Sequence, residues 1–362
     1  MKLKKLAEAT MWLPGLAPDD ALQVVPYFTQ SAEIIAFPSA DQAQVSVPVN
    51  EVDAPDLQVT VQTAIHEKKQ PRTLWPCLDP LLHSKLRGDV AKFDANIAAI
   101  SLLHRLEADN RPPTDDERDV LNCYTGWGGI AKAFNPEQDE PTWKAKAESM
   151  PEILGEDYES AKGSVVNAHF TEVFVIEAIW DAVRRMGFRG GCVLEPSAGA
   201  GYFIGAMPKD MAEASEITAI EIDRLSSRIL SRLYGHHGVR AMAVGFEKAR
   251  LPKDWFDLVI SNVPFGNYQV PDDRNLPYAN FLIHDYFFCR ALEVTRPGGL
   301  VAFITSAGTL DKWDDQARRY IGAHAKFVGA IRLPSGTFSH LANTEVTTDI
   351  VFLQKLAEGE KA

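Results

Sequence analysis

Cysteine is scarce in this sequence, and the few cysteines are far apart. The 362 residues include four, with no CxxC pair and no histidine at metal-ligand spacing. A disulfide framework and a structural zinc site are therefore not expected, and this cysteine usage is typical of a reducing compartment. We expect no metal in the functional site. The cysteines are Cys77, Cys123, Cys192 and Cys289.

Long apolar runs are also missing. No stretch approaches the ~18 apolar residues that a membrane helix needs. The segment Met1–Leu16 carries three lysines, but Glu8 and Pro14 interrupt it, so it lacks the run of ~7–15 apolar residues of a signal peptide. The sequence therefore predicts a soluble, cytoplasmic protein with no membrane contact.

The chain has too few basic residues for a protein that binds a polyanion with its whole surface. Lys and Arg number 37 against 49 Asp and Glu, for a net charge of -12. Residues 1–161 hold 15 basic and 26 acidic residues, whereas residues 162–355 hold 21 of each. The acidic excess thus belongs to the N-terminal part, which we expect to dock a basic partner subunit or to cover a binding cleft.

Three regions of the sequence differ in composition and residue pattern. Residues 1–87 are irregular: an alternating stretch is broken by Pro48 and Pro55, which indicates edge strands or a mobile arm. Residues 88–161 are predicted to be helical, with an apolar face over 89–109 and a capping box at Thr114 and Glu117 that opens a short helix. An acidic, proline-containing stretch over 136–162 is predicted to be a linker.

Residues 162–356 alternate short apolar runs with amphipathic segments. This alternation predicts a mostly parallel, seven-stranded α/β sheet of Rossmann-like type with helices on both faces. In such sheets ligands bind at the carboxyl ends of the strands. Strands are expected at 192–194, 217–220, 239–244, 256–260, 300–304, 327–333 and 346–353, and helices at 171–186, 224–234, 281–295 and 313–324.

The loop after the first of these strands is rich in glycine. It begins with Glu195 and contains Gly199 and Gly201, so the backbone can turn sharply and approach a ligand closely. A dinucleotide GxGxxG pattern is not met, because the third glycine, Gly205, comes one residue late. A carboxylate at the strand end suits an ammonium group better than a pyrophosphate. A glycine turn that only packs against a helix is the alternative.

The second strand ends at another carboxylate. Glu221 lies 20 residues beyond Gly201, where it can accept the hydroxyl hydrogens of a ribose. Asp223 is expected instead to cap the following helix. Together, Glu195 and Glu221 indicate an adenosine ligand with a cationic tail.

The fourth strand runs into Asn262-Val263-Pro264-Phe265. The Asn262 side-chain oxygen and the Val263 carbonyl can each accept one hydrogen of an exocyclic amine, and Phe265 can stack on a planar base. Such a site makes a weak amine nucleophilic. A simple strand-ending turn is the alternative.

These motifs resemble class I S-adenosylmethionine-dependent methyltransferases, most closely the N6-adenine DNA methyltransferases. The resemblance implies that DNA is the substrate and that the target adenine is flipped into a pocket formed by Asn262, Val263, Pro264 and Phe265. It also implies a set of cofactor contacts, with Phe246 as the ring stacking on the cofactor's adenine: His169, Phe170, Thr171, Glu195, Ser197, Ala198, Gly199, Gly201, Glu221, Ile222, Phe246, Glu247 and Asn262.

Residues 89–355 also resemble the methyltransferase portion of methyltransferase–helicase fusion proteins carried by phages, plasmids and integrative elements. The most specific segments are 126–129 (GWGG), 262–266 and 344–349. We interpret Trp127 of the first as a packing residue. After the last predicted strand the sequence offers no separate recognition domain or helicase, so selectivity is expected from loops such as 268–277 and from the N-terminal third.

Two positions depart from the family pattern. Val263 replaces a proline, and Gly245 stands where an acid often holds the cofactor's adenine amine, which leaves Glu247 as a substitute. Two alternatives therefore stay open: a methyltransferase acting on RNA or on protein glutamine, and a non-catalytic subunit of a mobile element that binds cofactor or DNA.

Overall fold

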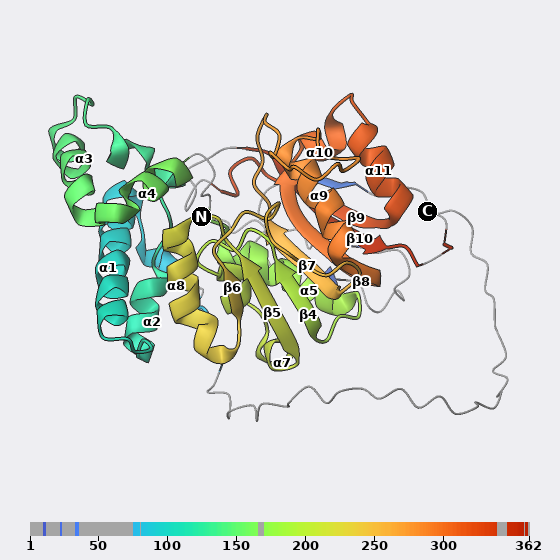
Figure 1. Cartoon of the computed structure of the whole chain (residues 1–362), viewed down its shortest axis with the longest axis horizontal. Helices are drawn as coiled ribbons and strands as arrows, with labels where there is room; N and C mark the ends of the chain where they lie inside the picture. The colour runs from blue at the N-terminus through green and yellow to red at the C-terminus, as the bar shows by residue number, and fades with distance from the viewer. Residues whose placement is uncertain are drawn as a thin grey trace, which may run out of the picture.

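A mixed sheet forms the centre of the protein (Figure 1). The structure is a computed structural model that describes residues 10–11, 22–23, 33–35, 75–79, 81–165, 170–338, 346–357 and 359–360. The alternating stretch around Pro48 and Pro55, the predicted cofactor contact His169, and residues 344–345 of the segment 344–349 lie outside these residues. In the described part the strand order is β3-β9-β10-β8-β7-β4-β5-β6.

All seven predicted strands are present, and β4 to β8 pair in parallel. Strand β10 lies antiparallel between β8 and β9, and the short β3 adds an eighth strand at the β9 edge. This arrangement confirms the predicted Rossmann-like, mostly parallel α/β sheet and adds one strand to it. The bounds are β3 (Glu33–Ile35), β4 (Gly191–Glu195), β5 (Ser215–Ile220), β6 (Arg240–Met242), β7 (Phe256–Asn262), β8 (Thr295–Ser306), β9 (Ala325–Leu333) and β10 (Thr348–Lys355), with a separate antiparallel pair of β1 (Thr10–Met11) and β2 (Leu22–Gln23).

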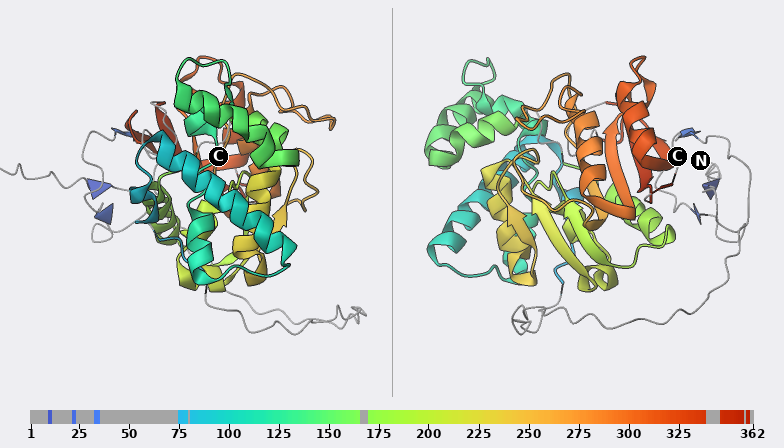
Figure 2. Two further views of the ribbon diagram at one scale, coloured as in Figure 1. Left: turned by 90° about the vertical axis from the view of Figure 1, so that its left-hand side faces the viewer. Right: turned by 45° about the vertical axis from the view of Figure 1, so that its right-hand side comes forward.

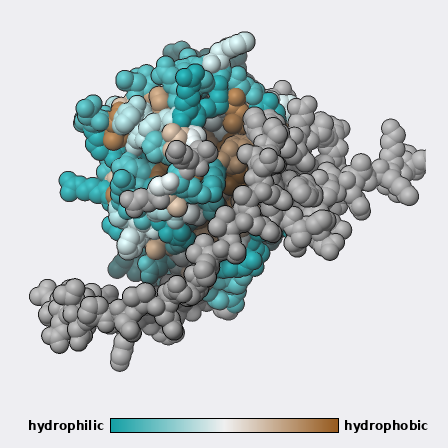
Figure 3. All heavy atoms as spheres, turned by 90° about the vertical axis from the view of Figure 1, so that its right-hand side faces the viewer, coloured by the Kyte–Doolittle hydropathy of each residue, from teal (hydrophilic) through white to brown (hydrophobic). Residues whose placement is uncertain are grey.

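Helices pack on both faces of the sheet because buried residues alternate along its central strands. On β8, Ala302 and Ile304 belong to one hydrophobic cluster, and Val301 and Phe303 belong to the other. The first cluster includes residues of α5 (Val173–Arg185), α6 (Tyr202–Gly205), α7 (Lys209–Glu213) and α8 (Arg224–Tyr234); the second is covered by α9 (Ile283–Val294), α10 (Gly308–Asp311) and α11 (Gln316–His324). Seen from the side of α11, the described surface is mainly hydrophilic (Figure 3).

Further helices lie beside α8, at the β6 end of the sheet (Figure 2). They are α1 (Gly88–Ala108), α2 (Asp115–Asn122), α3 (Pro141–Leu154) and α4 (Tyr158–Ser164), with a 3₁₀ segment at Gly128–Phe134. The predicted capping box opens α2: the Thr114 hydroxyl accepts from the Glu117 N–H, and the Glu117 carboxylate accepts from the Thr114 N–H.

The predicted linker over 136–162 is wrong, because α3 and α4 occupy most of it. Pro141 stands in the first turn of α3, where its missing N–H costs nothing. Pro151 lies in the last turn and does not prevent the helix. The decisive signal is the spacing of four buried residues along one face of α3: Trp143, Ala147, Met150 and Leu154.

The helical region is joined to the sheet by shared core and by ion pairs. One hydrophobic cluster includes residues of α1, α3, α5 and α8. Arg228 of α8 contacts Glu107 of α1 at 2.5 Å and the buried carboxylate of Asp157 at 2.5 Å. These contacts fix α8, and with it the end of β5 where the site begins.

Candidate functional site

The three chemistry-bearing loops meet at one edge of the sheet. Glu195 ends β4, Glu221 follows β5 and Asn262 ends β7. The strand order β7-β4-β5 makes these strands neighbours, and all three run in the same direction. Their carboxyl ends therefore share one edge, as the sequence predicted.

The loop after β4 is folded tightly onto β5. The Ala198 N–H donates to the Ile220 carbonyl at 2.9 Å, and the Gly201 N–H donates to the Ala198 carbonyl at 2.8 Å. Gly199 and Gly201 adopt φ angles of 53° and 89°, which glycine reaches without strain. The buried ring of Phe170 lies over Gly199, 3.4 Å from where a Cβ would stand. The backbone conformation therefore favours glycine at both positions, and at Gly201 there is also no room for a side chain.

The Gly201→Ala variant should lose about 1–3 kcal/mol of unfolding free energy, because overpacking costs that much. Its Cβ would lie 2.7 Å from Cε2 of Tyr234, in a backbone conformation that alanine disfavours. Chemical denaturation measures the loss. The control is Gly322→Ala in α11, where no atom lies within 4 Å and the gain should be about 0.5–1 kcal/mol. Equal denaturation midpoints for Gly201→Ala and wild type would contradict the prediction.

Glu195 is a buried carboxyl whose Oε2 atom has no hydrogen-bond partner among the described residues. Burial, with a smaller contribution from the charge of Glu221, raises its pKa well above the usual range. A cationic group placed beside Oε2 would supply the missing partner and favour the ionised form. Glu195 can therefore hold the ammonium end of a ligand.

Glu221 joins the ends of β4 and β5. Its Oε2 accepts from the Gly199 N–H at 2.6 Å, and its Oε1 accepts from the Asp223 N–H at 2.7 Å. Burial raises its pKa to about 7, against the opposing effect of these hydrogen bonds. Each carboxylate oxygen keeps a lone pair for a ligand hydroxyl. Asp223 caps α8 by accepting from the Ser226 N–H, as predicted.

Phe246, the predicted adenine-stacking ring, and Ile222, another predicted cofactor contact, differ in exposure. Ile222 is 70% exposed beside Glu221, whereas Phe246 is 2% exposed and packs against Phe287, with Arg290 above its ring. Of these two side chains, only that of Ile222 therefore offers an exposed apolar surface to a ligand. The Glu247 carboxylate folds back over Gly245, into the space that a side chain at that position would occupy. Glu247 thus places a carboxylate in the space of a side chain at position 245, where the family pattern often has an acid.

Asn262 joins the loop after β7 to the segment before α5. Its Nδ2 donates to the buried Thr171 hydroxyl at 3.0 Å, while its Oδ1 is buried and has no partner within the described chain. The preceding residue, Ser261, contacts the glycine loop, because its hydroxyl donates to the Ser197 carbonyl at 3.3 Å. Asn262 therefore presents an unused acceptor beside the ligand loops.

The next residue extends the strand. The Val263 N–H donates to the Ile304 carbonyl of β8 at 3.1 Å, and its side chain is buried. Pro264 and Phe265 follow, both half-buried. His169, predicted to contact the cofactor, lies outside the described residues, whereas Phe170 and Thr171 are buried at the site.

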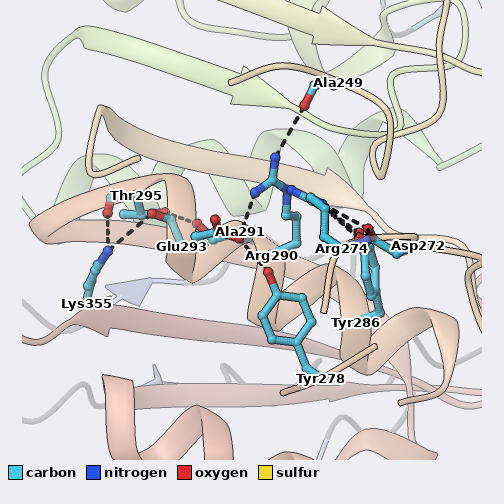
Figure 4. Close-up of polar contacts among 10 residues, drawn as sticks. All are labelled: Ala249, Asp272, Arg274, Tyr278, Tyr286, Arg290, Ala291, Glu293, Thr295 and Lys355. Atoms are coloured by element: carbon cyan, nitrogen blue, oxygen red, sulfur yellow. Dashed lines mark hydrogen bonds and ion pairs between the residues drawn. The ribbon is translucent and has the colours of Figure 1, made fainter. Parts of the chain in front are cut away.

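A polar network that we did not predict anchors the loop after Phe265 to α9 (Figure 4). Asp272 accepts from Tyr286 at 2.5 Å and from Arg274 at 2.6 Å, and these bonds fix the first half of the loop. The pKa of Asp272 is held well below its usual range, chiefly by Arg274. The sequence signal was a helix face, since Tyr286, Arg290 and Glu293 lie one turn apart.

The second half of the same network reaches the loop after β6. Tyr278 donates to Glu293 at 2.5 Å, and Arg290 donates to Glu293 at 2.6 Å and to the Ala249 carbonyl at 3.3 Å. Buried Arg290 thus ties the loop that contains Phe246 and Glu247 to the loop that follows Phe265. Both sides of the site are held by one helix.

The described residues show neither a metal-binding cluster nor a membrane-spanning helix. They contain no group of three or more His, Cys, Asp or Glu side chains arranged to hold a metal ion. They also contain no helix with the length and apolar character that crossing a bilayer requires.

Comparison with known proteins gives one curated relative. No family model matches the chain. The defense against restriction protein B of Escherichia phage P1 is 30% identical over 270 residues, which is 74% of this chain and 10% of that protein. The chain therefore spans about a tenth of the length of this relative.

Two solved structures are similar to this chain at low sequence identity. A Listeria monocytogenes protein described as a class I S-adenosylmethionine-dependent methyltransferase is 16% identical, with a TM-score of 0.48 over 74% of this chain and 90% of that one. The M protein of the type I restriction enzyme EcoKI is also 16% identical, with a TM-score of 0.43 over 72% of this chain and 61% of that one.

Proposed function

We propose that this chain transfers a methyl group from S-adenosylmethionine to the N6 amine of adenine in DNA. The observation that carries the proposal is the buried, unpartnered Oδ1 of Asn262, held by Thr171 at the edge where the ligand loops meet. Such an acceptor needs a donor, and an exocyclic amine supplies one.

The cofactor fits the groups that surround this acceptor. S-adenosylmethionine supplies an activated methyl group on its sulfonium. Glu195 would hold the ammonium group through its partnerless Oε2, and Glu221 would accept from the ribose hydroxyls. Ile222 would cover the adenine, and Glu247 would accept from the adenine amine.

At the target amine, the chain accepts hydrogens and aligns the reacting atoms. Asn262 Oδ1 and the Val263 carbonyl each accept one N–H, which draws the nitrogen lone pair out of the ring and stabilises the positive charge that develops. A flipped base would stack on Phe265. No side chain has to act as a strong base, because the product can lose its proton to water.

A hydrogen bond of the Val263 N–H supports a catalytic loop that lacks the family's first proline. A proline fixes the direction of its carbonyl through its ring. Here the hydrogen bond from the Val263 N–H to the Ile304 carbonyl holds the preceding Asn262–Val263 peptide in line with β8, a bond that proline cannot make, and so restrains the backbone just before the Val263 carbonyl. This observation favours an active enzyme over a non-catalytic subunit.

DNA is preferred over RNA and protein as the substrate because the sequence relative is named for defence against restriction. Incubation with tritiated S-adenosylmethionine and, separately, DNA, RNA and protein extract tests the choice. Label in DNA at N6 of adenine is expected. Label in RNA or protein alone would overturn the substrate, and cofactor binding by calorimetry with no label anywhere would overturn the activity.

Cofactor affinity should depend on pH through Glu221. Its pKa of about 7 means that the free site is protonated below pH 7, whereas acceptance of two ribose hydroxyls favours the carboxylate. Binding therefore expels a proton, and the apparent dissociation constant should rise by up to about tenfold per unit as pH falls below 7. Calorimetric titrations from pH 6 to 8 measure it. Glu221→Gln should reduce this dependence to the part that proton release from Glu195 contributes, and a pH-independent affinity in the wild type would count against the assignment.

A further inference from the structure

The connection from β6 to β7 leaves part of the sheet without a helical cover. Residues 243–255 contain no helix, and Figure 1 shows β4, β5 and β6 bare on the side that carries α9. A groove of about 890 Å³ lies here, bounded by these strands, by the connection and by the Pro112–Pro113 turn. It is lined by Cys192 near the start of β4 and Phe256 at the start of β7, so it opens at the sheet edge opposite the candidate active site.

The groove carries an excess of positive charge. Three arginines line it against one acid, the exposed Glu216. Arg118 pairs with Asp115. The exposed side chains of Arg240 and Arg250 have no hydrogen bond or ion pair within the described part of the chain. Two guanidinium groups are therefore free to bind an anion such as phosphate.

An aromatic ring lies in the same groove. Trp255, at the end of the connection, is 55% exposed, although a tryptophan is usually well buried. The combination of free arginines and an open indole matches the way proteins bind single strands, with cations along the backbone and an aromatic side chain under a base. A duplex keeps its base faces stacked and could not use the indole.

We propose that this groove binds a single-stranded nucleic acid, with Arg240 and Arg250 on its phosphates and Trp255 stacked on a base. The site is separate from the methyl-transfer site, because the two lie at opposite edges of the sheet. It would hold a strand whether or not that strand is methylated.

Fluorescence anisotropy of a short labelled oligo(dT), titrated with the full chain at several salt concentrations, tests the site. Arg240→Glu with Arg250→Glu should weaken binding at least about tenfold and reduce the salt slope by about 1.4, the value for two single-strand phosphate contacts. The matched control is Lys209→Glu with Arg319→Glu, an equal charge change on α7 and α11, which should have a much smaller effect.

Trp255→Ala separates stacking from charge. Loss of one stacked base should weaken binding about fivefold to a hundredfold, and Trp255→Phe should restore most of it. Calorimetric affinity for S-adenosylmethionine should not change in any groove variant, which keeps this test distinct from that of methyl transfer. Wild-type oligo(dT) affinity in the Arg240→Glu/Arg250→Glu variant would overturn the proposal. The proposal would also be overturned if Trp255→Ala bound oligo(dT) normally and a polyglutamate peptide displaced the oligonucleotide, because the groove would then bind polyanions without stacking a base.

Discussion

Replacing Asn262 by alanine should reduce methyl transfer to DNA by about 10²- to 10³-fold and leave the affinity for S-adenosylmethionine nearly unchanged. The expected loss is that of one preorganised hydrogen-bonding group that acts on developing charge. Asn262 Oδ1 is buried and partnerless within the described chain, so the variant removes an acceptor that the protein itself does not use. Single-turnover label transfer measures the rate, and calorimetry measures cofactor binding.

Two further variants show whether the loss of methyl transfer is due to Asn262 Oδ1. Asn267→Ala removes an exposed asparagine from the same loop and should transfer the methyl group at the wild-type rate. Thr171→Val removes only the acceptor for Asn262 Nδ2, so it should cost less than Asn262→Ala. An unimpaired rate in Asn262→Ala would refute both the role of the residue and the proposed reaction.

Replacing Trp127 by alanine should lower the unfolding free energy by about 3–5 kcal/mol, as for other fully buried large aromatics. Trp127 is 0% exposed, and its ring lies 6.1 Å from Phe93 and 5.3 Å from Phe134, centroid to centroid. The residue belongs to the GWGG motif, to which no chemistry is assigned. Urea denaturation followed by far-ultraviolet circular dichroism measures the loss.

The control for Trp127 is Trp313, which is fully exposed. Trp313→Ala should change the unfolding free energy by less than about 0.5 kcal/mol. Trp127→Ala molecules that remain folded should still bind S-adenosylmethionine, because the ring contacts neither Glu195 nor Glu221. A stable Trp127→Ala variant without cofactor affinity would instead place this motif in the binding site.

Sequence reasoning succeeded where the information is local. The strands were predictable because short apolar runs alternate with amphipathic helices, and the meeting of the three loops was predictable because each loop directly follows its strand. Glu195, Glu221 and Asn262 needed only the rule that parallel strands end at one edge.

Sequence reasoning failed where a local rule was applied too strictly or where partners are far apart. The prolines hid α3, although Trp143 and Met150 showed its buried face. The bond between Asp272 and Tyr286 and that between Arg290 and Ala249 join segments whose proximity depends on tertiary packing. The groove was hidden for the same reason, since its arginines belong to separate segments.

The shared core of the helical region and the sheet decides where the chain can be cut. Leu78 N–H donates to the Gly205 carbonyl at 2.9 Å, and Trp75 stacks on Tyr234 of α8. A truncation starting at residue 162 would leave Arg228 without either carboxylate and expose apolar surface along α8. Such a fragment should aggregate on expression, whereas one beginning at or before Trp75 keeps these contacts. The smallest unit suited to crystallisation or fusion therefore includes the helices as well as the sheet.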